Sequence, residues 1–260
     1  MKKILKYSLA DMLRGRWAFI FFAFYFIVSL SLIHFTGNPA KVILSLMNVV
    51  LFLNPLIATV FGVMYYYNNR DFTELLLALP QRRIGIFLGQ YFGLAISLSV
   101  SYGIGIALPF LLFGLFNPAL LFDFLPLLFT GITLLFVFSA IAGWVVMKHN
   151  DKLKGFGLAI VIWLLLALVY DGFILFLLVR FNDYPTDKLA LWLTLGNPID
   201  LSRVSLMLQL DYAALMGYSG AVFKHFLGTG TGIVISTIAL LLWVIVPLLF
   251  YLRKAVSRDF

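Results

Sequence analysis

Residues 156–179 read FGLAIVIWLLLALVYDGFILFLLV, an unbroken apolar stretch in which only Asp171 carries a formal charge. An α-helix needs about 20 mostly apolar residues to cross a bilayer. A strand of a membrane barrel would instead place a polar side chain at every second position, and residues 160–166 show none. The stretch therefore predicts a membrane-spanning helix.

Five further stretches share this length and apolar character; they are residues 17–36, 42–67, 86–116, 119–147 and 232–252. The 260-residue chain is 63% hydrophobic and only 12% charged, about half the charge of a soluble domain. This composition excludes an ordinary soluble enzyme and a disordered chain, and it predicts an all-α membrane protein with six spans. The chain has no cysteine, which excludes disulfides, thiolate metal sites and cysteine nucleophiles.

Lysine and arginine are unevenly divided between the two ends of these spans. One side carries Lys2, Lys3, Lys6, Arg14, Arg16, Arg70, Arg82, Arg83, Lys148, Lys152, Lys154, Arg253, Lys254 and Arg258; the other carries Lys41, Arg180, Lys188, Arg203 and Lys224. Basic residues accumulate on the cytoplasmic side of membrane proteins, so we expect both termini in the cytoplasm. The net charge of +8 is then explained by anionic lipid rather than by nucleic acid.

The chain predicts one transmembrane domain over residues 1–260, which begins with an interfacial helix. Within residues 1–16, apolar side chains recur at near-helical spacing among lysines and arginines, a pattern typical of a helix in the membrane interface. The apolar run that follows is longer than the 7–15 residues of a signal peptide and lacks a small-residue cleavage site. We therefore expect an uncleaved first span.

The cytoplasmic segment 68–84 predicts a short amphipathic helix. Asp71 suits a helix cap and Pro80 a helix end. Four apolar side chains at i, i+3, i+4 and i+7 form one face; they are Phe72, Leu75, Leu76 and Leu79. This helix either rests on the membrane surface or docks in a groove of a cytoplasmic partner, and periodicity does not separate the two.

The extracytoplasmic segment 181–231 is the longest part of the chain between predicted spans, and it predicts two helices. Asn197-Pro198 is a strong helix start, with Asn as cap and Pro at the first helical position. The first helix runs to Asp211 and the second covers residues 213–226. Both are largely apolar, so we expect the lipid interface, a second copy of the chain or a partner protein to cover them.

Several patterns suggest catalysis or metal binding without the spacing that either needs. Gly217-Tyr218-Ser219-Gly220 resembles a rhomboid-type serine motif, but His225 would lie on the opposite face of a continuing helix. Met207, Met216 and His225 are nine residues apart, which also alternates faces. No P-loop for ATP occurs. Asn54 and Asp171 are polar side chains inside predicted spans, and Asp171 is equally compatible with a functional role and with a structural ion pair.

The overall plan resembles the ABC-2 (type V) permeases. The shared features are the amphipathic N-terminal helix, six spans with both ends inside, and the segment Glu74-Leu75-Leu76-Leu77-Ala78-Leu79-Pro80 followed by Arg82-Arg83. The outer segment resembles one branch more closely, the NosY-type permeases of the ABC transporter required to mature nitrous oxide reductase. That resemblance covers the whole chain and is most specific in residues 197–223, notably Asn197-Pro198-Ile199-Asp200 and Ala214–Phe223.

The resemblance implies a non-catalytic subunit of the bacterial inner membrane with several partners. The permease would form a homodimer with two copies of a cytoplasmic ATPase, which binds ATP and Mg. Outside the membrane it would hold a periplasmic β-helix copper-delivery protein and act indirectly with a copper-chaperone lipoprotein and nitrous oxide reductase. This chain itself would bind no cofactor and no metal, and copper would be handled by the periplasmic partners.

Two groups of site residues follow from the resemblance. The ATPase-coupling group is Arg70, Phe72, Glu74, Leu75, Leu76, Leu79, Arg82 and Arg83. The periplasmic partner-binding group is Asn197, Pro198, Asp200, Arg203, Met216, Gly217, Tyr218, Gly220 and Phe223. Two alternatives stay open: an ABC-2 exporter of a small solute, such as a sulfur compound or lipid, and a multi-spanning membrane enzyme that uses Ser219 or Asp171.

Overall fold

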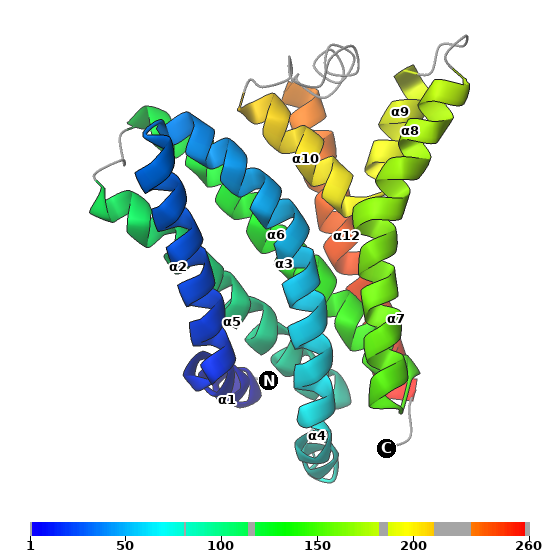
Figure 1. Ribbon diagram of the computed structural model, residues 1–260. Coiled ribbons are helices and arrows are strands. Elements are labelled where there is room, and N and C mark those ends of the chain that lie inside the picture. The colour runs from blue at the N-terminus through cyan, green and yellow to red at the C-terminus, as the bar shows by residue number, and fades with distance from the viewer. Residues whose placement is uncertain (1, 81, 114–117, 182–186, 211–229, 258–260) are drawn as a thin grey trace.

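The computed structural model describes residues 2–80, 82–113, 118–181, 187–210 and 230–257, and the regular elements in these ranges are all helices (Figure 1). Six of them are long and apolar enough to cross a membrane. In chain order they are α2 (Arg16–Thr36), α3 (Pro39–Asn68), α5 (Arg83–Leu112), α6 (Pro118–Lys148), the continuous run of α7 (Lys152–Leu164), η1 (Leu165–Val169) and α8 (Tyr170–Arg180), and α12 (Gly230–Ser257). The predicted all-α architecture with six spans is confirmed.

The ends of the spans differ slightly from those predicted. Helix α5 ends at Leu112 rather than at residue 116, and the fifth span begins at Lys152, where Asp151 caps the helix by accepting a hydrogen bond from the Leu153 amide. Both chain ends and the short helix α4 (Arg70–Leu77) lie at the same end of the bundle (Figure 1). That this end faces the cytoplasm stays a prediction from the distribution of basic residues.

The core forms where α3 packs along α6. Asn54 lies here with none of its surface exposed. Its Oδ1 accepts a hydrogen bond from the Tyr25 hydroxyl at 2.6 Å, and its Nδ2 donates to the Gly131 carbonyl at 3.2 Å. A buried amide is costly without partners; the observed pair of bonds gives Asn54 a structural role that joins α2, α3 and α6.

The N-terminal helix α1 (Lys2–Arg14) packs against α5. Ile4 and Ser8 are buried in this contact. Glycine on α5 permits the close approach, because a Cβ on Gly93 would lie 2.5 Å from the Ser8 Cβ and 3.2 Å from the Leu9 amide nitrogen. Small residues allow membrane helices to approach in this way. The helix predicted for residues 1–16 is present as α1, and one of its sides is covered by α5.

Replacing Gly93 by leucine is expected to displace α1 from α5. The contact atoms include backbone, so the added side chain cannot be accommodated by a rotamer change, and overpacking of this kind costs about 1–3 kcal/mol. Limited trypsin digestion at Lys6 should become faster. Gly103→Leu provides the control, because no atom lies within 4 Å of a Cβ built there; equal digestion rates for the two variants would contradict this role of Gly93.

Helices α9 (Asp187–Leu195) and α10 (Pro198–Gln209) form a hairpin between the fifth and sixth spans. At its tip, the Leu195 carbonyl accepts a hydrogen bond of 3.0 Å from the indole nitrogen of Trp243, in the middle of α12. The Asn197 side-chain nitrogen donates to the Leu166 carbonyl at 2.7 Å, in the middle of the fifth span. The tip therefore lies level with the middle of two spans, as in a re-entrant segment.

This position corrects part of the sequence interpretation. A helical segment between spans 5 and 6 is present, but residues 187–209 are not confined to the outside of the membrane. Within the described ranges, the apolar face of α10 packs on α3, α6 and α12 of the same chain, with Ile199, Leu201 and Leu206 at most 2% exposed. The chain's own spans cover this face, which was not among the three expected covers. The predicted second helix, 213–226, lies outside the described residues.

Candidate functional site: a docking helix and a re-entrant hairpin

Helix α4 is attached to the bundle on one side. The Gln90 side-chain nitrogen on α5 donates to the Thr73 hydroxyl oxygen at 2.7 Å, and that hydroxyl donates to the Asn69 carbonyl at 2.7 Å. The helix starts at Arg70 with Asn69 at the cap position, so Asp71 lies in the first turn and the prediction that it caps the helix is wrong. An acidic residue in a first turn still interacts favourably with the helix dipole.

The predicted apolar face of α4 is divided between an inner and an outer part. Phe72 and Leu76 are half-buried, and the Phe72 ring lies 4.9 Å from the ring of Tyr7 on α1. Leu75 and Leu79 are 69% and 51% exposed. The helix ends at Leu77, so Leu79 lies just beyond it. We call the exposed pair Leu75 and Leu79, with the neighbouring Phe72 and Tyr7, the docking surface.

The basic and acidic residues predicted for ATPase coupling lie around this surface. Arg70 and Glu74 form an i,i+4 ion pair of 3.1 Å, and both side chains are exposed. Arg82 is also exposed. Arg83 donates from Nη1 to the Val256 carbonyl at 3.3 Å, which joins the start of α5 to the end of α12. The structure thus brings the predicted coupling group together at one end of the bundle and gives Arg83 an internal contact.

The hairpin tip is built around the side chain of Asn197. Its Oδ1 accepts from the Ile199 amide at 3.1 Å, as expected of a helix cap. Its Nδ2 donates to the Leu166 carbonyl and to Asp200 Oδ2 at 2.8 Å. The five residues Leu165–Val169 form a π-helical turn, a feature that interrupts regular helical bonding. Asn197 thus joins the start of α10 to the irregular part of the fifth span.

An ion-pair cluster lies next to this tip. Arg203 Nη1 is 2.6 Å from Asp171 Oδ2 and 3.4 Å from Asp200 Oδ1. The side chains of Arg203 and Asp171 are 31% and 39% exposed, whereas that of Asp200 is 7% exposed. Of the two roles expected for Asp171, the structure favours a structural ion pair, because its carboxylate is paired with Arg203. The partner of Asp171 comes from the hairpin and not from the fifth span itself.

The residues predicted to bind a periplasmic partner lie in different environments. Asn197, Pro198 and Asp200 are buried within the chain, so for these three the prediction of direct contact with a partner is corrected to a role inside the fold. Arg203 is partly exposed and pairs internally. Met216, Gly217, Tyr218, Gly220 and Phe223, like Ser219 and His225, lie outside the described residues. In the described part of the chain, no three His, Asp or Glu side chains gather as a possible metal site.

Sequence reasoning missed Arg203 as the partner of Asp171, and it missed the contact between Tyr7 and Phe72. Arg203 is 32 residues from Asp171, and no local spacing links them. The available signal was a carboxylate inside an apolar stretch, which requires a partner. That signal shows that a cation is needed without showing which one supplies it.

Two curated proteins share sequence with most of this chain. Over 218 residues it is 31% identical to "Probable ABC transporter permease protein NosY" of Stutzerimonas stutzeri, covering 77% of this chain and 79% of that protein. Over 231 residues it is 29% identical to the protein of the same name from Pseudomonas aeruginosa, covering 82% and 84%. No protein-family model matches the chain.

Six spans together with these relatives define the membrane permease subunit of an ABC transporter, a multi-pass protein that in bacteria lies in the inner membrane. The relationship favours a transporter subunit over a catalytic enzyme. Within this class, the chain belongs to the NosY permeases.

Proposed function

We propose that this permease couples ATP hydrolysis by a separate cytoplasmic ATPase to a periplasmic process, the assembly of the copper site of nitrous oxide reductase. It acts as a homodimer with two ATPase subunits and holds a periplasmic copper-delivery protein. The resemblance of residues 197–223 to NosY-type permeases supports the periplasmic part. The observation that carries the coupling role is the docking surface, an exposed apolar patch on a helix that is hydrogen-bonded to the bundle.

A continuous set of contacts runs from the docking surface to the hairpin. Helix α4 follows α3 directly at Asn69. In the middle of α3, the Phe52 carbonyl accepts a hydrogen bond of 3.3 Å from the indole of Trp163 on α7. Three residues along the fifth span, the Leu166 carbonyl accepts from Asn197 at the hairpin tip. A displacement of α4 can therefore be transmitted to the hairpin through α3 and the fifth span, and this continuity of contacts supports the coupling role.

The test is purification of the tagged full-length permease from its native membrane, followed by identification of the bound subunits. We expect an ATPase that carries a P-loop and a repeat-rich periplasmic protein. The permease alone should not hydrolyse ATP, because its sequence contains no P-loop. Recovery of the ATPase without any periplasmic protein would remove the periplasmic assembly role and leave an exporter. Hydrolysis of ATP by the isolated permease would contradict the proposal that a separate subunit is the ATPase.

A further inference from the structure

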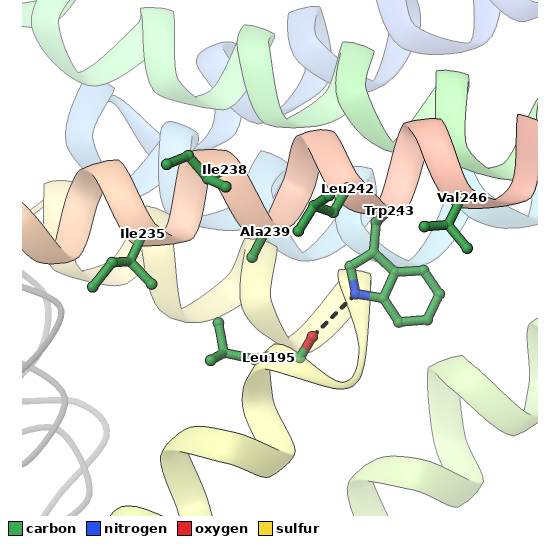
Figure 2. Close-up of a pocket in the computed structure, with 7 residues that line it drawn as sticks. All are labelled: Leu195, Ile235, Ile238, Ala239, Leu242, Trp243 and Val246. Carbon is green, nitrogen blue, oxygen red and sulfur yellow. Dashed lines mark hydrogen bonds between the residues drawn. The ribbon is translucent and has the colours of Figure 1, made fainter.

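Two apolar cavities adjoin each other along one side of α12. The upper one has a volume of about 480 Å³ and lies between α12 and the hairpin tip (Figure 2). The lower one, of about 510 Å³, lies between α6, α7 and α12. Both are lined by Trp243 and Val246, so together they form one trough, which extends along α12 from Ile235 to Phe250. At 1.5 Å per residue this length is about 22 Å, within the roughly 30 Å hydrocarbon thickness of a bilayer.

In the part of the chain that the structure describes, the wall of the trough has almost no polar groups that could bind a soluble ligand. The lining includes Ile141, Leu158 and Ile162 in the lower part and Ile238 and Leu242 in the upper part. The Trp243 indole nitrogen is already bonded to the Leu195 carbonyl, as Figure 2 shows. Sites for small polar molecules need several polar groups that fix the ligand's orientation. The trough therefore favours a long apolar ligand.

Among the described residues, one charged side chain lines the trough, and it lies at the end near Phe250. Lys148 is the last residue of α6, and its ammonium lies 5.3 Å from the centroid of the Trp144 ring. Among the described residues, no carboxylate lies within ion-pair distance of Lys148. A long apolar trough that ends at a cation without a carboxylate partner is complementary to a molecule with apolar chains and an anionic head.

We propose that the trough binds an anionic membrane phospholipid, with its phosphate at Lys148 and its acyl chains along α12. Trp144 lies beside the head, the position that tryptophan commonly takes at a membrane interface. The upper ends of the chains reach Leu195 and Trp243. The lipid therefore contacts the hairpin tip. It fills the space next to the hydrogen bond between Trp243 and Leu195, which attaches the tip to α12.

Native mass spectrometry of the full-length permease tests this proposal. Protein transferred from nanodiscs that contain phosphatidylglycerol or phosphatidylcholine should retain phosphatidylglycerol preferentially. Lys148→Gln should weaken phosphatidylglycerol retention about fivefold, since one basic residue near anionic lipid contributes about 1 kcal/mol. The control Lys154→Gln, an exposed lysine outside the trough lining, should leave retention unchanged.

A second pair of variants tests the trough itself. Val246→Trp fills the space shared by the two cavities and should abolish retention of both lipids, whereas Leu249→Trp, on an exposed position outside the lining, should not. Equal retention in Lys148→Gln and the parent protein would overturn the proposal. The chain has no native cysteine, so Val246→Cys can also be cross-linked to itself. Efficient cross-linking between two copies would place a second permease in the trough and exclude the lipid.

Discussion

Replacing Leu75 by aspartate is expected to weaken ATPase binding strongly while leaving the permease folded in the membrane. Leu75 is 69% exposed, so the isolated permease loses little stability when this side chain is replaced. If the docking surface is buried by the ATPase, however, the new carboxylate is buried without a partner, which costs about 3–5 kcal/mol. The ATPase should then bind at least a hundredfold more weakly, as measured by co-purification and titration of the purified subunits.

Leu153→Asp is the matched control. Leu153 is an exposed leucine, 83% accessible, in the first turn of α7 at the same end of the bundle, and it is not part of the docking surface. It should bind the ATPase as the parent protein does. Normal ATPase binding by Leu75→Asp would show that the partner does not cover this surface. Leu76→Asp would be less informative, because Leu76 is half-buried and its replacement also disturbs the permease.

Replacing Arg203 by alanine is expected to detach the hairpin tip from the fifth span while the ATPase still binds. The change leaves Asp171 and Asp200 without their shared cation, and a hydrogen bond to a charged group contributes about 1.5–3 kcal/mol. The affected contacts are local, so the hairpin should open more often than the rest of the bundle unfolds. Hydrogen exchange measured by mass spectrometry should rise in residues 197–209, and maturation of nitrous oxide reductase should fail.

Two further variants test whether charge pairing attaches the hairpin tip to the fifth span. Arg203→Lys keeps the cation and should recover part of the protection. Arg180→Ala removes an exposed arginine at the end of α8 that forms no ion pair among the described residues, and it should have no effect. If Arg203→Ala exchanges like the parent protein, the ion-pair cluster does not hold the hairpin.

The spans were predictable because the bilayer imposes a simple requirement. A run of about 20 apolar residues is visible without knowledge of its neighbours, and all six runs became helices. The start of α10 was predictable for a similar reason, since the cap and the first-turn proline act within three residues. The short helix at residues 70–77 was predictable from the local spacing of its apolar residues.

Features that depend on contacts between distant segments were not predictable. An apolar hairpin has the same composition whether it lies on the surface or among the spans, so the depth of its tip follows from the bonds of Asn197 to Leu166 and of Trp243 to Leu195. The division of the α4 face depends on Tyr7, which is distant in sequence from Phe72. The π-helical turn at residues 165–169 has no marker in a run of Leu, Ala and Val.

The hydrogen bond between Trp243 and Leu195 also restricts the order of biosynthesis. The ribosome completes Leu195 forty-eight residues before Trp243, and until then this carbonyl lacks its partner. An unsatisfied carbonyl in hydrocarbon costs several kcal/mol, so entry of the hairpin is expected to wait for the last span. A chain that stops before Gly230 should leave Ala190→Cys open to a thiol reagent added from outside, whereas the complete chain should protect it; equal labelling would show that the hairpin enters without that span.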